Sequence, residues 1–392
     1  MKTYEFWSRF PMDLWEKQSF VLDEVPQFSW IEDSNCLFKL TTEIVSNERS
    51  NPMDLRFIVT QEGRDYEVET GNQVNPDSLP QPKDNSFEQY NERLRKSFAK
   101  GVSGYSLVLN NVLKSEPRVW LGVRNFLKGF CEKVGLPSGG VSAGIMIGQY
   151  PRTPFGVHMD AGRSALIFPV VGQKKYRFWG EDYVKTHPEL NEAVSYEKHE
   201  AESTCLIANP GEVVYWPSTA YHIAEEGEKF TAMFSVGVFK SRKPGHPASY
   251  AIDPNNLQAS AGHLPDYIER LVRSSQAPTA QSLDSATRHW LELVTRLGIK
   301  FPIPERYSPL NGGALKIADR EFPIVTAALT GGECCIAANG HSIISNSPEC
   351  VEIVRRLNSG EEISIENLSK EQEGPVTAML NALWRFRVID AI

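Results

Sequence analysis

Three residues of the chain combine the side-chain types and the spacing of a metal centre. His158 and Asp160 are two positions apart, and His222 follows later in the chain. Residues two apart in an extended strand point to the same face, so His158 and Asp160 can both face the interior of a β-barrel. Two imidazoles and one carboxylate can hold one face of an iron(II) ion and leave positions for a cosubstrate and O2. A His-x-Asp pattern alone is common in surface turns, so the neighbouring elements must support this interpretation.

The segments around the three residues are typical of short β-strands. Apolar or alternating runs lie at 166–171, 174–179 and 213–216. Gly172 separates the first two runs, a turn at 209–211 precedes the third, and Pro217 ends the third shortly before His222. Short runs bounded by Gly and Pro indicate strands joined by turns. The sequence therefore predicts a barrel from about Ser142 to Val238 in which the two histidines and the aspartate meet.

The stretch from about Tyr105 to Phe239 resembles the JmjC/cupin-type 2-oxoglutarate-dependent oxygenases. The last-ligand motif of that family is Gly-Asp-x-x-Tyr-x-Pro-x-x-x-x-His. Here the motif is filled, with Glu for the usual Asp, by Gly211, Glu212, Tyr215, Pro217 and His222. The Gly-x-Lys of the family, on the strand after His-x-Asp, is Gly172-Gln173-Lys174. The resemblance implies a double-stranded β-helix, Fe(II) bound by His158, Asp160 and His222, and 2-oxoglutarate and O2 as cosubstrates.

Lys174 is the residue that the resemblance assigns to the cosubstrate. 2-Oxoglutarate would chelate the metal through its 1-carboxylate and 2-oxo group, and its far carboxylate needs a cation because a buried unpaired anion is costly. Strand alternation places Lys174, Tyr176 and Phe178 on one face. Lys174 could instead be a solvated strand end, and Lys175 takes the role if a bulge shifts the register by one residue.

Further cosubstrate contacts are expected near the two ends of the metal motif. Relatives use a polar side chain, often Asn, on the strand that enters the His-x-Asp turn, but here that position falls near Gly144, which has no side chain to offer. Tyr150 and Thr153 are the candidates on this side, although Thr153 is equally typical of a turn. Ser235, on the strand after His222, is a candidate cosubstrate contact or a hydrogen-bonding support for the ligands.

The composition of the chain limits which other classes of protein it can belong to. The chain has 392 residues, 41% hydrophobic and 23% charged, which is typical of a globular protein with one large and one smaller domain. A net charge of −8 without a basic run argues against non-specific nucleic-acid binding by the whole protein and leaves a local basic patch open. None of the six cysteines forms a CxxC pair, so neither a zinc ribbon nor a redox dithiol is indicated. Neither a secretory leader nor a run of about eighteen apolar residues is present, so a cytoplasmic protein without a membrane span is expected.

The organisation predicts three parts within a mainly β fold with flanking helices. Residues 1–240 form the oxygenase domain with its N-terminal flanking elements, 241–300 form a helical linker and dimerisation region, and 301–392 form a winged-helix-like domain. A Pro/Gly-rich break at 241–247 begins the linker. Helical spacing is found at 87–100, 119–134, 264–274, 282–297, 349–358 and 376–384. This arrangement resembles the ribosomal oxygenases of the family and implies a homodimer.

Three functions are consistent with the sequence. The resemblance implies a hydroxylase of an amino-acid side chain in a protein or peptide. A hydroxylase of a free small molecule, such as an amino acid, and a non-catalytic cupin-like binding module are the alternatives. Arg152 and Arg163 could meet an acidic group of the substrate or be solvated. An aromatic wall at the site mouth, or simply barrel packing, is expected of Tyr215, Trp216 and Tyr221.

Overall fold

The computed structural model describes residues 3–23, 26, 28–48, 55–61, 67–153, 155–225, 229–241, 246–274, 280–368 and 374–392. Its contacts divide the chain into two compact units. The first unit is Met1–Gly122 with Val141–Arg242, and the second is Val123–Gly140 with Lys243–Ile392. Residues 242–245 of the predicted break lie outside the described residues. The three-part division at residues 240 and 300 stays a prediction.

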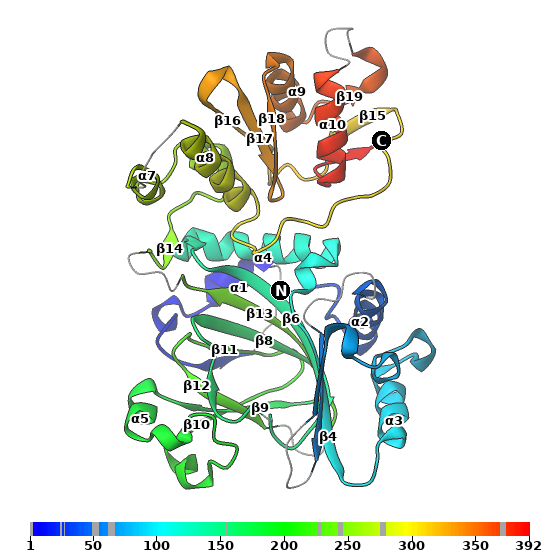
Figure 1. Ribbon diagram of the computed structural model, residues 1–392, viewed down its shortest axis with the longest axis vertical. Helices are drawn as coiled ribbons and strands as arrows, with labels where there is room; N and C mark the ends of the chain where they lie inside the picture. The colour runs from blue at the N-terminus through cyan, green and yellow to red at the C-terminus, as the bar shows by residue number, and fades with distance from the viewer. Residues whose placement is uncertain are drawn as a thin grey trace. The chain divides into compact units, whose positions relative to one another are not determined.

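The first unit is built on two antiparallel sheets (Figure 1). One has eight strands in the order β1-β11-β8-β13-β6-β4-β2-β3, and the other has four in the order β10-β9-β12-β7. The bounds are β1 Phe20–Leu22, β2 Leu55–Gln61, β3 Glu67–Thr70, β4 Val102–Leu109, β6 Gly140–Gln149, β7 His158–Met159, β8 Arg163–Val171, β9 Lys174–Trp179, β10 Thr204–Ala208, β11 Val213–Trp216, β12 Tyr221–Glu225 and β13 Thr231–Phe239. Between β6 and β13 the chain passes repeatedly from one sheet to the other, so both sheets contribute to one interior.

The strands predicted around the metal motif are confirmed, with one irregularity that has a simple cause. β8 pairs with β13 along its whole length, and Phe168 and Phe234 are opposite each other and buried. The register shifts where Pro169 pairs with Met233 and Val171 with Ala232. Proline has no N–H to donate to a neighbouring strand, so it is tolerated at such a bulge.

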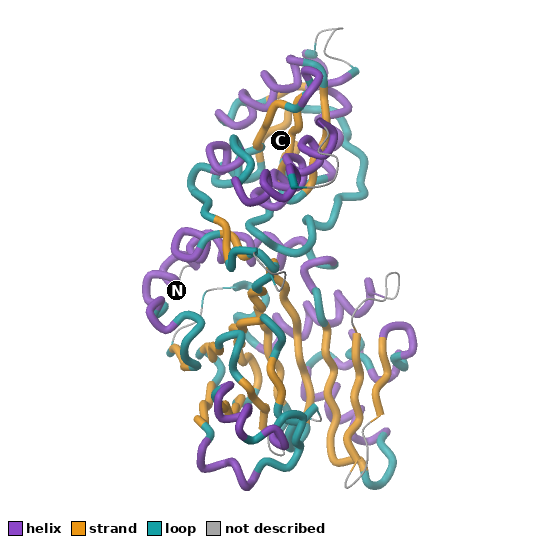
Figure 2. The backbone as a smooth tube through the Cα atoms, turned by 60° about the vertical axis from the view of Figure 1, so that its left-hand side comes forward, coloured by secondary structure: helices purple, strands orange, loops and turns teal. Residues whose placement is uncertain are grey.

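Helices accompany the sheets of the first unit. Their bounds are α1 Thr3–Arg9, α2 Ser34–Glu48, α3 Phe87–Ser97 and α5 Glu181–Thr186, and α4 Pro117–Val134 begins in this unit and ends in the second. The N-terminus of α3 is capped because the Ser86 hydroxyl accepts from the Gln89 N–H at 3.3 Å. Figure 2 shows the strands of this unit in orange, with helices in purple beside them. Antiparallel sheets with flanking helices agree with the coarse part of the predicted fold class, whereas the double-stranded β-helix and the winged-helix-like C-terminal domain stay predictions.

The second unit contains more β structure than the sequence predicts. Its helices are α6 Leu257–Ala261, α7 Asp266–Arg273, α8 Ala280–Thr295, α9 Pro348–Ser359 and α10 Pro375–Arg385. Its strands are β5 Leu136–Pro137, β14 Ser249–Tyr250, β15 Ala314–Ile317, β16 Val325–Ala328, β17 Cys334–Ala338, β18 His341–Ser345, β19 Ile363–Ser364 and β20 Ile389–Ala391. The predicted helices correspond to α7–α10. The sheets β19-β15-β20 and β16-β17-β18 were largely missed, because their strands are short and rich in Ala, Ser and Cys.

A tight hairpin joins β17 and β18 in the second unit. Ala338 pairs with His341, and the two residues between them, Asn339 and Gly340, have φ angles of 52° and 85°. Positive φ at both central positions is the geometry of a type I′ turn, for which Asn-Gly is the preferred sequence. The dipeptide was therefore a local signal for this hairpin. Among the described residues, each helix is too short or too polar to cross a bilayer.

Candidate metal centre

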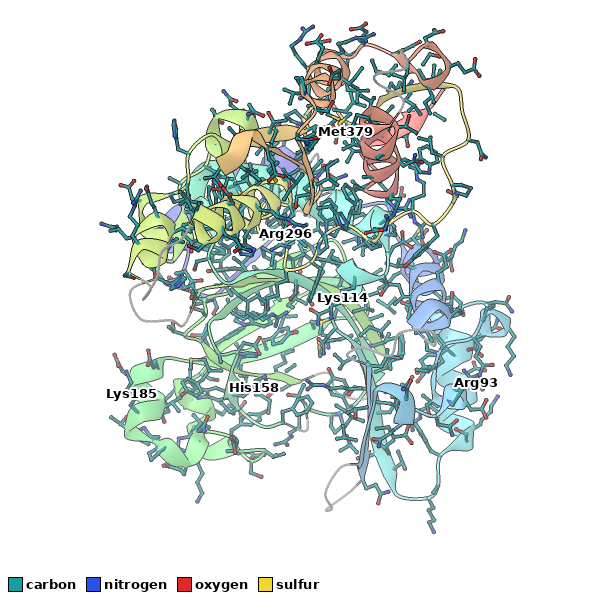
Figure 3. All side chains as sticks on the ribbon, turned by 45° about the horizontal axis from the view of Figure 1, so that its top comes forward. Arg93, Lys114, His158, Lys185, Arg296 and Met379 are labelled. Carbon is teal, nitrogen blue, oxygen red and sulfur yellow. The ribbon has the colours of Figure 1, made fainter. Side chains whose placement is uncertain are left out.

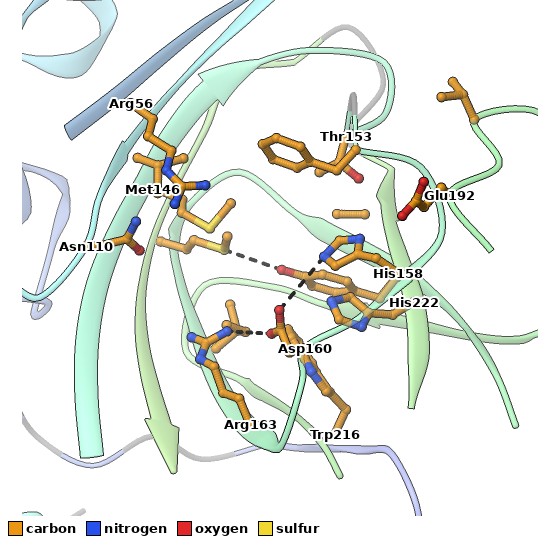
Figure 4. A pocket seen from close by; sticks show the side chains of 17 residues that line it. Arg56, Asn110, Met146, Thr153, His158, Asp160, Arg163, Glu192, Trp216 and His222 are labelled. Atoms are coloured by element: carbon orange, nitrogen blue, oxygen red, sulfur yellow. Dashed lines mark hydrogen bonds and ion pairs between the residues drawn. The ribbon is translucent and has the colours of Figure 1, made fainter. Parts of the chain in front are cut away.

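The fold brings the two histidines and the aspartate of the predicted triad together. β7 and β12 are antiparallel neighbours in the four-stranded sheet, and His158 pairs directly with His222 in their register. Asp160 follows β7 immediately. One candidate ligand atom from each of the three residues lies within 4.8 Å of the others. Figure 3 locates His158 in the first unit, and Figure 4 shows the three side chains converging at one cavity.

Backbone carbonyls orient both imidazoles. His158 Nδ1 lies 3.0 Å from the Gly156 carbonyl oxygen, and His222 Nδ1 lies 3.2 Å from that of Ala220. A carbonyl oxygen can only accept, so Nδ1 carries the hydrogen in each ring. Nε2 of each ring therefore keeps its lone pair for a metal. In both histidines the ring is thus oriented by the backbone carbonyl two residues earlier in the chain.

The charge states of the triad suit a divalent cation. Burial acts to raise the pKa of Asp160, but its interactions with neighbouring side chains, with the Arg163 guanidinium first among them, outweigh burial and lower that pKa. Arg163 Nη1 donates to Asp160 Oδ2 at 2.6 Å. Burial lowers the pKa of His222 to about 4, so this imidazole is neutral at pH 7. An ionised carboxylate and a neutral imidazole are the forms that ligate metals, and so the donor set fits an iron(II) ion.

The cavity beside the triad has a volume of about 750 Å³. Tyr176, Trp216 and Phe155 contribute aromatic walls, and the Trp216 ring centroid lies 4.6 Å from that of His222. Aliphatic and methionine side chains, such as Val108, Met146 and Ile167, and several charged and amide side chains line the remainder. Figure 4 shows Arg56 and Asn110 on one side of the cavity and Glu192 on the other, with the triad between them.

Lys174 and Tyr150 form a buried polar pair, and neither is among the residues that line the cavity. Lys174 is 1% exposed and its Nζ donates to the Tyr150 hydroxyl at 3.1 Å. Burial lowers the pKa of Lys174 well below its usual value and raises the pKa of Tyr150. As the strand alternation predicted, Lys174 shares a buried face of β9 with Tyr176, which lines the cavity. Lys175 is on the other face, in an ion pair with Glu225 at 2.5 Å.

Two buried donors at the cavity wall have no hydrogen-bond partner among the described residues. They are the Thr153 hydroxyl and the Trp216 indole N–H. Buried polar groups are normally satisfied, so these two donors are exceptions within the described part of the chain. Ser235, by contrast, lies between strands, where its hydroxyl donates to the Gly144 carbonyl at 3.3 Å. Gly144 itself has no room for a side chain, because a Cβ there would lie 2.9 Å from the Leu109 carbonyl oxygen.

The remaining predicted residues have different surroundings. Arg163 lines the cavity beside Asp160, whereas Arg152 pairs with Glu197 at 3.0 Å and is not among the lining residues. Of the three aromatic residues expected at the mouth, Trp216 lines the cavity. The other two do not: Tyr215 packs on Phe10, Trp15 and Phe20, and Tyr221 packs against the cluster that contains Trp179.

Sequence reasoning missed three polar residues of the cavity wall, namely Arg56, Asn110 and Glu192. Arg56 lies on β2, whereas Asn110 follows β4 and Glu192 follows a single helical turn at Pro188–Leu190. None belongs to a motif, and their proximity to the triad depends on the tertiary fold. Glu192 has a φ of 64°, which is uncommon for a residue other than glycine.

Comparison with known proteins defines the fold class. No family model matches the chain, and no curated protein matches it. Among solved structures, the mixed α/β fold with several antiparallel sheets is similar to that of Escherichia coli ycfD. The X-ray structure of Escherichia coli ycfD aligns over 98% of this chain and 97% of its own, with 17% identity and a TM-score of 0.50. A second structure, described as ycfD, a ribosomal oxygenase from E. coli, has the same coverage and identity and a TM-score of 0.48. At this identity the likeness is one of fold.

Proposed function

We propose that the protein is an Fe(II)- and 2-oxoglutarate-dependent oxygenase that hydroxylates an amino-acid side chain in a protein or peptide. The observation that carries this proposal is the convergence of His158, Asp160 and His222 at the wall of a cavity. The alternation of β6–β13 between two sheets supports a double-stranded β-helix. The fold likeness to ycfD, a protein described as a ribosomal oxygenase, agrees with a protein substrate, although fold alone does not determine function.

The triad would hold the metal through both Nε2 atoms and the Asp160 carboxylate. When bound, iron(II) with 2-oxoglutarate and O2 supplies the oxidising chemistry that converts a C–H bond into an alcohol. The protein's own contribution is to orient the ligands and to exclude water. The carbonyls of Gly156 and Ala220 fix the imidazoles, and Tyr176 and Trp216 give the cavity an aromatic wall.

Lys174 and Tyr150 are the groups that we assign to the far carboxylate of 2-oxoglutarate. A carboxylate beside a buried ammonium favours its charged form and so opposes the lowering of the Lys174 pKa by burial. The unpartnered hydroxyl of Thr153 and indole N–H of Trp216 are further donors for a bound cosubstrate or substrate. Ser235 would act indirectly, by its hydrogen bond to the backbone of β6.

A free small molecule is the second candidate substrate. Arg56 and Glu192 carry opposite charges on the wall of the same cavity, which suits a free amino acid with its carboxylate and ammonium groups. The homodimer, the lack of a nucleic-acid partner and the cytoplasmic location also stay proposals. A mass of 44.0 kDa by size exclusion with light scattering would exclude the dimer.

Succinate release tests the proposed function. The protein is assayed with Fe(II) and 2-oxoglutarate in the presence of ribosomal-protein peptides and, separately, of free amino acids, and products are analysed by mass spectrometry. Hydroxylated peptide is the expected result. Turnover that only free amino acids stimulate would favour the small-molecule function. Equal 2-oxoglutarate consumption by the wild type and His158→Ala would contradict an oxygenase, and absence of turnover in the wild type would favour a binding module.

A further inference from the structure

Glu16 has an unusual backbone conformation for a residue with a side chain. It lies between the single helical turn Met12–Leu14 and β1, and its φ is 59°. The left-handed region is disfavoured for residues other than glycine, and a residue persists there when its surroundings fix it. Although Glu16 is charged, its side chain is 12% exposed.

The segment that contains Glu16 is fixed on β11. The Glu16 N–H donates to the Tyr215 hydroxyl at 2.9 Å. The Trp15 ring stacks on Tyr215 with centroids 5.1 Å apart, and Phe20 pairs with Tyr215 across the β1–β11 register. The N-terminal segment is thus bound to the strand that leads to the last ligand, His222.

The Glu16 carboxylate joins three separate elements. One oxygen accepts from the Ser218 hydroxyl at 2.6 Å and from its N–H at 3.4 Å, and pairs with Lys240 Nζ at 2.6 Å. The other accepts from the hydroxyl of Ser164. Charged acceptors form the stronger class of hydrogen bonds, so these contacts restrain their partners.

Ser218 lies in the turn that orients His222. The Ala220 N–H donates to the Pro217 carbonyl at 3.1 Å, which closes the turn around Ser218. The Ala220 carbonyl then accepts from His222 Nδ1 at 3.2 Å. A shift of Ser218 would therefore rotate the Ala220 carbonyl, which fixes the orientation of the His222 imidazole.

Ser164 and Lys240 connect Glu16 with the segment that holds Asp160, the carboxylate of the triad. Ser164 directly follows Arg163, the ion-pair partner of Asp160. The Lys240 N–H donates to the Gly162 carbonyl at 2.9 Å, within the turn in which the Arg163 N–H donates to the Asp160 carbonyl at 2.9 Å. The Glu16 carboxylate is thus connected through its partners with the turns that hold two of the three triad residues, Asp160 and His222.

We propose that Glu16 is a positioning residue of the metal centre. Through Ser218 and Ser164 it fixes the orientation of the metal ligands, and it does not contact the metal itself. The inference rests on the proposed function, since it presumes that the triad binds a divalent cation. Removal of a group that hydrogen-bonds directly to a metal ligand typically weakens metal binding by roughly ten- to a hundredfold. Glu16 acts on the ligands through its own partners, so a smaller effect is expected of it.

Cobalt(II) binding in the absence of 2-oxoglutarate tests the inference. The dissociation constant is measured by calorimetry, and the ligand field is monitored by the visible absorption of the bound ion. We expect Glu16→Ala to weaken Co(II) binding by up to roughly tenfold and to change the absorption bands. Glu16→Gln, which keeps an acceptor oxygen for Ser218, should give a smaller loss. If Glu16→Ala does not fold, Ser218→Ala serves as the second variant and should also weaken binding.

Asp84→Asn is the matched control. Asp84 is also a buried carboxylate of the first unit, but its partners are the Gln81 N–H and Arg93. This variant should lower the melting temperature of the metal-free protein and leave Co(II) binding unchanged. If the Glu16 variants lower the melting temperature but bind Co(II) as tightly as the wild type, with the same spectrum, Glu16 is structural only. If the wild type and His158→Ala bind Co(II) equally weakly, the metal centre and this inference both fail.

Discussion

At the residue scale, the candidate site contains two kinds of residue. Some belong to local sequence patterns, and others are brought to the site only by the tertiary fold. His158, Asp160 and Lys174 were predictable because strand alternation and a flanking glycine are local properties. Arg56 and Glu192 were not, because only the tertiary fold brings them to the cavity wall. Local patterns thus predict the candidate metal ligands of such a site better than the other residues of its cavity wall.

Lys174 provides a test at this scale. Lys174→Met keeps the length of the side chain but removes its charge, and a hydrogen bond to a charged group contributes about 1.5–3 kcal/mol. We expect the KM for 2-oxoglutarate to rise by roughly tenfold or more, with Co(II) affinity unchanged. Lys175→Met is the control, since Lys175 pairs with Glu225 on the other face of the strand. Equal KM values for the two variants would contradict the assignment of Lys174.

At the element scale, most long helices and the barrel strands were easier to predict than the small sheets, although the helix α2 was missed. α8 and α9 have apolar residues at helical spacing, and β8 and β11 are apolar runs bounded by glycine or proline. β16 and β17 consist mainly of Ala, Thr and Cys and are stabilised by pairing with each other. Strands of this kind depend on neighbours that are distant in sequence, so composition alone indicates them weakly.

The hairpin turn at Gly340 provides a prediction for these small sheets. Its φ is 85°, and a Cβ there would lie 2.9 Å from the Pro302 Cα. Gly340→Ala should therefore lower the free energy of unfolding by about 1–3 kcal/mol, measured by chemical denaturation. Gly312→Ala is the matched control, because its nearest neighbour is the Glu366 carboxylate at 3.9 Å. Similar losses in both variants would show that the turn geometry is not the cause.

At the scale of the whole molecule, the second unit is discontinuous in sequence. Residues 123–140 belong to it although residues 141–242 belong to the first unit. Within the second unit, Arg124 is 2% exposed, donates to Asp319 at 2.9 Å and lies over the Phe322 ring. Burial lowers the pKa of Arg124 to about 10, so the guanidinium remains charged at pH 7.

Two ion pairs of α4 with the C-terminal residues allow a comparison of buried and exposed charge. Asp319→Ala removes the hydrogen-bonded carboxylate partner of the buried Arg124 and, because the Asp319 side chain is itself 36% exposed, should cost about 2 kcal/mol of unfolding free energy. Glu321→Ala removes the Lys128 pair, in which the carboxylate side chain is 70% exposed, and should change that free energy by less than about 0.5 kcal/mol. Chemical denaturation of both variants measures the difference. Equal losses of unfolding free energy would show that burial of the arginine does not determine how much its ion pair contributes to stability.

The interrupted second unit also has a consequence for biosynthesis. β5 lies at Leu136–Pro137 and pairs with β14, which is more than a hundred positions further along the chain. While a ribosome translates the intervening barrel, the end of α4 has emerged but its partners have not yet been made. The first unit can reach its native state before translation ends, whereas the second must wait for the C-terminal residues.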